Sequence, residues 1–344
     1  MGLLLLFSIE GKGQILSKDS IDITMQRIEH YFLYRNHDST FIKSYANRLA
    51  LKMVAVNKIN YFSVNDKNHD SSIRYRPEYG VNLGLGLSYK WFALELAFNV
   101  GLKEDKDFQE SEYFDFQGRV FSSKQFLEGS LQYYYGHILG NLSGIDGTIE
   151  EIPEIREDIR TISFGLQYLY AFKYDKFSLK APFVLNEIQL KSAGSPIFGA
   201  SFAYFSMDAD SSIVPPSIMD QFDPKLHITD FNVISLAVNL GYMYTFTWKK
   251  HFFITLGLIP GLNFNLGDSK AEARESFKWN VSYRIKTMNA LGYNSERVFT
   301  GFQFLSDWNN IRIDRHLHFK FTYGSVKFFV GYRFGGRKNR TKGE

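Results

Sequence analysis

Residues 234–248 read ISLAVNLGYMYTFTW, with a large apolar side chain at almost every second position. One alternate set begins with Ile234, Leu236 and Val238 and ends with Trp248. The other set consists of Ser, Ala, Asn, Gly, Met and Thr side chains. Because successive side chains of a strand point to opposite faces, this period of two predicts a long strand with one apolar face and one small or polar face.

The same alternation recurs along most of the chain. Clear runs occupy residues 81–90, 92–99, 162–172, 252–265, 316–323 and 326–334. Weaker runs occupy residues 49–57, 112–121, 124–135, 176–188, 197–207, 277–288 and 297–306. Together they predict an all-β protein of about 12–14 strands, in which Gly324 marks the turn between the last two.

The composition supports this assignment and excludes several classes of protein. Aromatic residues make up 17% of the 344 residues, and 27 Gly stand against only 8 Pro, which favours strands over helices. No apolar run reaches the roughly 18 residues that a membrane-spanning helix needs. Since the chain has no Cys, it has neither disulfides nor thiolate metal sites. A net charge of +4 is small for this length, so nucleic acid is not an expected partner.

Strand length separates a soluble sandwich from a membrane barrel. Soluble strands average roughly five to six residues, whereas a strand that crosses a bilayer needs about 9–11. Several of the runs reach the longer figure, and their polar faces suit a wet lumen. Aromatic residues also stand beside the expected turns, as Tyr89, Trp248, Phe252 and Tyr323 do, which is typical of an interfacial girdle. We therefore predict a transmembrane antiparallel up-and-down β-barrel, with a soluble β-sandwich binding module as an alternative.

The chain divides into four predicted segments. Residues 1–14 contain the apolar run GLLLLFSI and form a truncated or residual signal-like segment. Residues 15–47 lack alternation and are expected to be a periplasmic lead-in or a plug. Residues 48–334 form the outer-membrane barrel, and residues 335–344 form a basic C-terminal tail.

The direction of the last strand predicts on which side each loop lies. If that strand runs toward the periplasm, residues 58–78, 102–111, 137–159 and 189–196 are expected to be outer loops. The same count places residues 208–230 on the periplasmic side, which is unusual for a connection of that length.

Several short stretches carry a resemblance to a known family. They are NRLALK at 47–52, IRYRP at 73–77, VNLGLGLSYKW at 81–91, QLKSAGS at 189–195, DADSS at 208–212, LGYNS at 291–295 and GYRF at 331–334. In their order along residues 45–334 the chain resembles outer-membrane β-barrels of the Bacteroidota that are grouped only as a domain of unknown function. The resemblance implies an exported barrel and supplies no catalytic residue. Its members tend to stop near a terminal aromatic residue, whereas this chain continues past Phe334.

Signatures of catalysis are missing from the sequence. There is no G-x-S-x-G elbow, H-E-x-x-H helix, Walker A loop or dinucleotide fingerprint. An enzyme acting at the rim, of the lipase or protease type, is a second alternative, with His137, Ser143 and Asp146 as its loop residues. His316 and His318 share a strand face, but the sequence offers no third metal ligand beside them. We expect no cofactor, no metal and no catalytic residue.

Charged side chains gather on the face that is predicted to line the lumen. The residues expected there are Glu95, Asp115, Arg119, Glu128, Arg284, Lys286, His316, His318, Lys320 and Arg333, and also Lys180 and Lys327. The acids belong to early strands and most of the bases to the last ones, which are neighbours once the sheet closes. Opposite charges are therefore predicted to pair across the interior and plug it, and a wet lumen that conducts ions is the alternative.

These features predict a non-enzymatic outer-membrane protein, either a narrow pore or an envelope scaffold with a partly self-plugged lumen. Its expected partners are outer-membrane lipid, the barrel-assembly machinery during insertion, and a protein of the envelope.

Overall fold

The computed structural model describes residues 37–77, 80–89, 92–99, 112–122, 124–145, 155–271 and 274–335. Almost all of the regular structure in these residues is β-strand. The helical pieces are α2 (Lys180–Phe183) and two 3₁₀ segments, η3 (Pro216–Gln221) and η4 (Pro224–Leu226). Within this part of the chain, no helix has the length and apolar character needed to cross a membrane.

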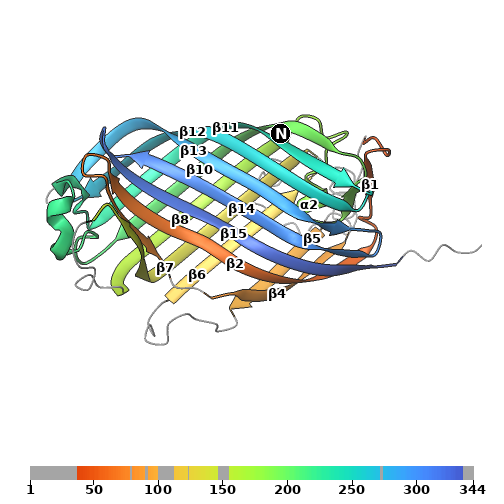
Figure 1. Cartoon of the computed structure of the whole chain (residues 1–344), viewed down its shortest axis with the longest axis horizontal. Helices are drawn as coiled ribbons and strands as arrows, with labels where there is room; N and C mark the ends of the chain where they lie inside the picture. The colour runs from red at the N-terminus through yellow and green to blue at the C-terminus, as the bar shows by residue number, and fades with distance from the viewer. Residues whose placement is uncertain are drawn as a thin grey trace, which may run out of the picture.

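Ten of the strands form a closed antiparallel ring, which confirms the predicted barrel (Figure 1). Each strand is hydrogen-bonded to the next, and β15 returns to β2 along their whole lengths. In order around the ring the strands are β2 (Leu49–Asp66), β3 (Ser71–Arg76), β7 (Gln125–Ser143), β8 (Ile155–Ala171), β10 (Ala193–Asp208), β11 (Asp230–Trp248), β12 (Phe252–Lys270), β13 (Arg274–Asn294), β14 (Val298–Arg312) and β15 (Leu317–Phe334).

One flank of the ring contains three further strands, β4 (Asn82–Tyr89), β5 (Phe92–Asn99) and β6 (Glu112–Phe121). Strand β2 pairs with β3 over 62–66 and with β4 over 50–56. Strand β7 likewise pairs with β3 over 138–143 and with β6 over 126–135. The short β3 therefore closes the ring at one end, while β4–β5 and β6 form the wall at the other. The described sheet has 13 strands, within the predicted 12–14, although its closed ring is narrower.

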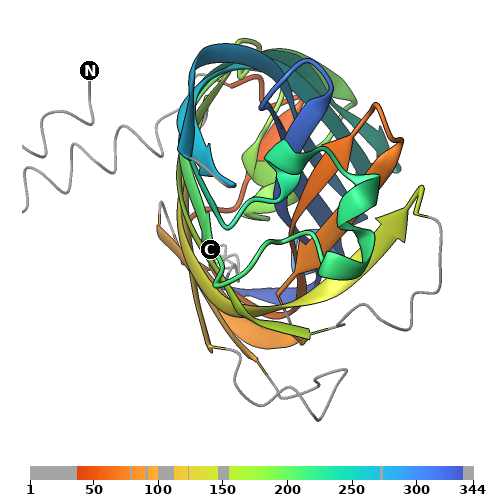
Figure 2. The ribbon, with the colours of Figure 1, turned by 90° about the vertical axis from the view of Figure 1, so that its left-hand side faces the viewer.

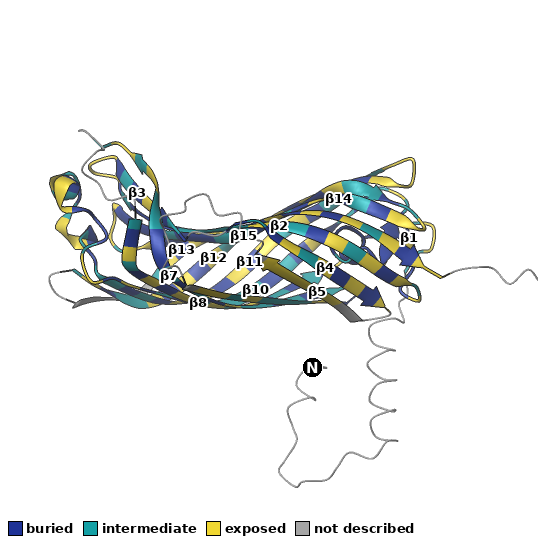
Figure 3. Cartoon of the chain, turned by 90° about the horizontal axis from the view of Figure 1, so that it is seen from below, coloured by how far each residue is buried: buried dark blue, intermediate teal, exposed yellow. Residues whose placement is uncertain are grey.

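Side chains alternate across the wall as the sequence predicts for residues 234–265. On β11, Leu240 is 65% exposed, whereas its neighbour Asn239 is fully buried. Figure 3 shows the resulting bands of exposed and buried residues along the strands. Strands β11 and β12 have 19 residues each and meet at Lys249 and Lys250, both with positive φ. They are longer than the roughly 9–11 residues that cross a bilayer, so the barrel extends beyond its apolar belt.

The closing strand differs from the prediction. Residues 317–334 form one strand without a turn at Gly324. A continuous alternation that exposes Phe328 on the outer face must point Phe319 and Phe321 inward, and both are at most 4% exposed. The predicted outward direction of the apolar residues in 316–323 is therefore wrong, because a turn would have reset the alternation. Tyr323 also points inward rather than into an aromatic girdle, and its hydroxyl contacts Asp307 inside the barrel.

Two predicted connections lie on the opposite side from the one expected. The run 176–188 is not a wall strand, because it contains α2 and part of the short β9 (Glu187–Gln189). The wall therefore lacks both the strand predicted at 176–188 and the turn predicted at Gly324. As a result, residues 208–230 lie at the end of the barrel opposite Phe334, and residues 189–196 lie at the same end as Phe334. The predicted loops 58–78 and 137–159 are also shorter than expected, because β2, β3, β7 and β8 extend into them.

The end at which the described chain begins and ends is called here the proximal end. It is filled by the proximal plug, residues 37–46 and 173–192, in which β1 (Ile42–Ser44) pairs with β9. Phe177, Leu179 and Leu185 of the plug have no exposed surface. The signal-like segment 1–14, most of 15–47 and most of the tail 335–344 lie outside the described residues.

The opposite, distal end is covered by the distal cap, residues 208–230 (Figure 2). Ile213, Val214 and Leu226 of the cap are fully buried among inward-facing aromatic side chains of the wall. Tyr75 of β3 donates a hydrogen bond from its hydroxyl to the Ile213 carbonyl at 2.8 Å. Phe319 and Phe321 of β15 belong to the apolar core under the cap.

Candidate functional site

A chain of ion pairs crosses the middle of the barrel. Glu128 of β7 accepts from Arg119 Nε of the adjacent β6 at 2.5 Å. Its other carboxylate oxygen lies 3.2 Å from Lys286 Nζ of β13. Since β7 and β13 are not neighbours in the ring, this pair spans the interior.

Asp307 of β14 extends this series of ion pairs beyond Lys286. Arg284 of β13 donates to both of its carboxylate oxygens, and Lys286 Nζ lies 3.5 Å from one of them. Asp307 is not among the predicted lumen residues because the predicted run stops at residue 306, whereas β14 continues to Arg312. Extending the alternation of β14 by one position would have placed this carboxylate on the inner face.

A second group of charges lies beside β5. Glu95 accepts from Lys327 of β15 and from Lys52 Nζ of β2, the latter at 2.7 Å. Gly86 of β4 makes room for this lysine, since an added Cβ would lie 2.5 Å from Lys52 Cε. Lys52 is not among the predicted lumen residues, because it lies in the weakly alternating run 49–57.

Asp115 of β6 contacts both a cation and neutral hydrogen-bond donors. Lys58 Nζ of β2 lies 2.7 Å from its carboxylate, and the Tyr134 hydroxyl and the Gln132 amide donate to the same oxygen at 2.5 and 3.0 Å. This carboxylate is therefore held by neutral donors as well as by a cation.

The network has more positive than negative charge. Among the described residues, its cations are Lys52, Lys58, Arg119, Arg284, Lys286 and Lys327, and its carboxylates are Glu95, Asp115, Glu128 and Asp307. The six cations exceed the four carboxylates by two formal charges. One surplus cation belongs to the group at Glu95, and the other to the group of Arg119, Glu128, Lys286, Asp307 and Arg284.

Three of the predicted lumen residues lie elsewhere. His316 is exposed in the turn before β15, and His318 and Lys320 point to the outer face of the wall, where they contact Asn310 and Asn65. They are displaced because the register of β15 places even-numbered residues outside. The remaining predicted residues of the wall point inward, namely Glu95, Asp115, Arg119, Glu128, Arg284, Lys286, Lys327 and Arg333.

Arg333 faces inward but is separate from the central charges, because it holds the proximal plug. Its guanidinium donates to the Leu185 carbonyl and, at 2.6 Å, to the Asn294 side chain. Asn294 in turn donates to the Glu187 carbonyl at 3.0 Å, and Gln303 donates to the Pro182 carbonyl at 2.7 Å. Inner-wall side chains thus satisfy plug carbonyls that would otherwise be buried without donors. Lys180, also predicted in the lumen, is a buried part of α2.

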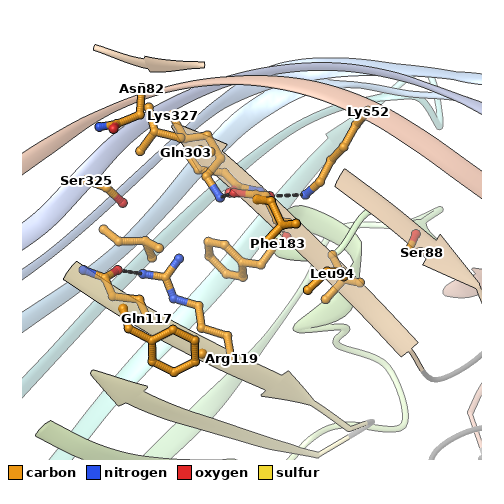
Figure 4. A pocket seen from close by; sticks show the side chains of 18 of the residues that line it. Lys52, Asn82, Ser88, Leu94, Gln117, Arg119, Phe183, Gln303, Ser325 and Lys327 are labelled. Carbon is orange, nitrogen blue, oxygen red and sulfur yellow. Dashed lines mark hydrogen bonds and ion pairs between the residues drawn. The ribbon is translucent and has the colours of Figure 1, made fainter. Parts of the chain in front are cut away.

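A side cavity of about 500 Å³ opens beside these charges (Figure 4). Its lining includes Lys52, Glu95, Arg119 and Lys327 of the inner face, and Phe183 of the proximal plug. It also includes outward-facing side chains of β5 and β6, namely Leu94, Leu96, Phe116 and Val120. A single cavity with both inner and outer residues in its lining passes through the wall between β5 and β6.

His137 and Ser143, the two candidate catalytic residues that lie in the described part of the chain, each contact other groups. His137 is buried under the distal cap, where its Nδ1 lies 3.1 Å from the Ile159 carbonyl. Ser143 bonds with Ser72 at the rim, and Asp146 lies outside the described residues. The described part of the chain also contains no group of three His, Asp or Glu side chains placed to hold a metal ion.

Comparison with known proteins identifies the family. The model of a family described as a domain of unknown function, DUF4421, matches residues 36–334, so the chain belongs to that family. No curated protein sequence matches it.

Three solved structures of outer-membrane proteins share the general shape at low similarity. The outer membrane protease OmpT from Escherichia coli has 6% identity and a TM-score of 0.39, covering 85% of this chain and 98% of its own. The toluene transporter TodX of P. putida has 6% identity and a TM-score of 0.27, covering 85% and 91%. The outer membrane protein OprG from Pseudomonas aeruginosa has 10% identity and a TM-score of 0.21, covering 86% and 100%. At this level of similarity they bear on neither the activity nor the ligand of this chain.

Proposed function

We propose that this DUF4421 protein is an outer-membrane β-barrel without enzymatic activity whose axis is closed by its own residues. The observation that carries the proposal is the proximal plug, which is buried inside the wall and bonded to Arg333, Asn294 and Gln303. A mobile loop resting on a pore would not have its carbonyl groups satisfied by the inner wall in this way.

The outer surface supports placement in a membrane. Outward-facing residues of the long strands are large and apolar, as Leu240, Leu256, Leu258 and Phe328 are, and each is more than 40% exposed. An exposed apolar belt around a closed sheet requires lipid as its solvent, since contiguous patches of this kind are rare on soluble proteins. Outer-membrane lipid is therefore the first partner that we propose.

The end of the last strand bears on how the barrel is assembled and oriented in the membrane. The last strand ends with the exposed pair Tyr332 and Phe334, whose ring centroids are 4.9 Å apart. We propose that the barrel-assembly machinery recognises this strand and that the proximal end faces the periplasm. An envelope protein would then meet the plug from the periplasmic side.

Several features favour closure over conduction. The distal cap buries Ile213, Val214 and Leu226 without exposed surface, and the central acids already contact lysine and arginine side chains. Paired charges in a filled interior brace the barrel, whereas an ion pathway needs charged groups that face water. An enzyme at the rim is disfavoured because His137 is buried and bonded to a backbone carbonyl.

Conductance of the full chain in a planar lipid bilayer tests the proposal. The wild-type protein should show no steady current, because both ends are filled. Arg333→Ala removes the donors to Leu185 and Asn294, so it should produce brief openings. Lys320→Ala, on the outer face near the other end of β15, is the control and should remain silent. Steady current through the wild-type barrel would contradict the proposal.

A further inference from the structure

Strands β5 and β6 face each other across an interruption in the wall. Among the described residues, β5 pairs only with β4 and β6 only with β7. An unpaired strand edge at membrane depth leaves backbone N–H and C=O groups without partners, and each such group costs several kcal/mol in hydrocarbon. This β5–β6 seam is therefore an interruption through which a ligand with a polar head can enter the wall from the membrane.

The side cavity passes through this seam. Leu96 is 52% exposed on the outer face of β5, and Phe116 is 60% exposed on the outer face of β6. Both line the same cavity as Glu95, which lies on the inner face of β5. The cavity therefore joins the apolar belt to the charged interior.

The charge at the inner end of the cavity is not balanced. Glu95 lies between Lys52 and Lys327, so one carboxylate serves two ammonium groups. Arg119, which also lines the cavity, shares Glu128 with Lys286. A partly buried cation that lacks its own counterion is costly. A ligand with an anionic group would remove this cost.

We infer that the side cavity binds a single-chain amphiphile with a monoanionic head, such as a long-chain carboxylate, which enters from the membrane through the β5–β6 seam. The head lies among Lys52, Lys327 and Arg119, and the chain lies against Leu96, Phe116 and Val120. A volume of about 500 Å³ is within the range of small-molecule sites. The inference rests on the proposed membrane placement. A barrel closed along its axis would then still admit a ligand from the membrane through its side.

Two substitutions each lower the net charge of the cavity by one without leaving a carboxylate unpaired. Lys327→Met keeps the volume of the side chain, and Lys52 continues to pair with Glu95. Gln117→Glu adds a carboxylate beside Arg119, because the Gln117 side chain already accepts from Arg119 Nη2 at 3.0 Å. A purely structural role for Lys327 predicts that its loss lowers the melting temperature, whereas a ligand-binding role predicts an unchanged or higher one.

Binding of radiolabelled palmitate to the purified full chain in nanodiscs tests the inference. Palmitate should bind saturably and at least tenfold more tightly than hexadecanol, measured by competition. Lys327→Met and Gln117→Glu should each weaken palmitate binding about tenfold, leave hexadecanol binding unchanged, and keep the melting temperature. Lys327→Arg should restore the affinity, and Lys320→Met on the outer face should not change it. Acetate should not compete, because it has the head without the chain.

Equal affinities for palmitate and hexadecanol would overturn the inference, and so would palmitate binding that both Lys327→Met and Gln117→Glu retain. An absence of palmitate binding would also overturn it, and the unpaired edges of β5 and β6 would then remain for a strand of another polypeptide. The two proposals fail separately. A barrel that conducts steadily but binds palmitate contradicts only axial closure, and a silent barrel that binds none contradicts only the amphiphile site.

Discussion

The β11–β12 flank and the β5–β6 flank share an apolar outer face but differ in their backbones and interiors. A ladder joins β11 to β12 from Asp230 and Lys270 to Trp248 and Phe252, whereas none joins β5 to β6 in the described residues. The paired flank points Ser, Thr and Asn side chains inward, and the split flank points Lys, Arg, Glu and Asp inward.

The difference shows what each kind of wall requires. A continuous ladder satisfies its own backbone, so its inner face needs only small polar groups such as the Thr245 and Thr255 hydroxyls, 2.8 Å apart. At the split flank, long charged side chains reach across the interior to other strands, as Lys286 of β13 does to Glu128 of β7 and Lys58 of β2 does to Asp115 of β6.

Removal of a central carboxylate should damage the split flank most. Glu128→Ala leaves Arg119 and Lys286 with one carboxylate fewer inside the barrel, so we expect a loss of up to about 3–5 kcal/mol in the free energy of unfolding. Urea unfolding of the protein in lipid vesicles, followed by its gel mobility, measures this free energy.

The paired flank supplies the control for that change. Neither polar atom of the Asn239 side chain has a hydrogen-bond partner among the described residues, so Asn239→Ala should cost about 1 kcal/mol or less. If the two substitutions cost the same, the charges of the split flank are hydrated and contribute little, as exposed pairs do.

A charge on the outer face should distinguish lipid contact from the seam. Leu240→Arg on β11 places a guanidinium in the apolar belt and should cost about 2–4 kcal/mol near mid-bilayer. Leu96→Arg on β5 should cost less than half of that, because its long side chain can turn into the side cavity and be hydrated. Refolding into vesicles measures both, with Leu240→Phe and Leu96→Phe as controls. Equal costs would mean that lipid covers the seam as it covers the paired wall.

The neutral interior of the paired flank can be tested by a double substitution. Thr245→Val leaves the buried Thr255 hydroxyl without its partner, which should cost about 1–3 kcal/mol. Adding Thr255→Val should recover most of this loss, because no unsatisfied hydroxyl remains. Unfolding free energies of the two single variants and the double variant give the coupling. A double variant as unstable as the sum of the singles would show that water already satisfies both groups.

The smallest effect is expected outside both flanks, where the distal cap meets the turn before β15. Lys225 Nζ lies 3.1 Å from Asp314 in an exposed pair, so Lys225→Ala should change stability by about 0–1 kcal/mol. The backbone N–H of Arg315 and the Lys225 ammonium lower the pKa of Asp314. A lowered carboxyl pKa stabilises the fold above the ordinary value of about 3.9 and ceases to do so as the pH falls through the folded value. Melting temperatures of wild type and variant should therefore converge on acidification, and a difference that persists in acid would contradict this assignment.

Some of the inward-facing residues could be predicted from the sequence, and particular residues show where such prediction fails. Arg284 and Lys286 are placed correctly on the inner face, because they lie in the same alternating run as their neighbours on β13. Asp307 is missed at the end of a run, and His318 and Lys320 are assigned to the wrong face across a turn that does not exist. The composition of the proximal plug resembles that of a weak strand, so the run 176–188 carries no signal that it folds inside the barrel.

The all-β class, the long strands and the outer face of residues 234–265 follow from the local sequence pattern, because alternation is a property of each extended segment. Tertiary structure alone decided the inward direction of Phe319 and Phe321, the burial of residues 173–192, and the interruption between β5 and β6. Alternation fixes only which residues of one strand share a face. Which strands are joined, and where pairing stops, depends on contacts between segments far apart in the chain, such as Lys327 with Glu95 and Lys286 with Glu128.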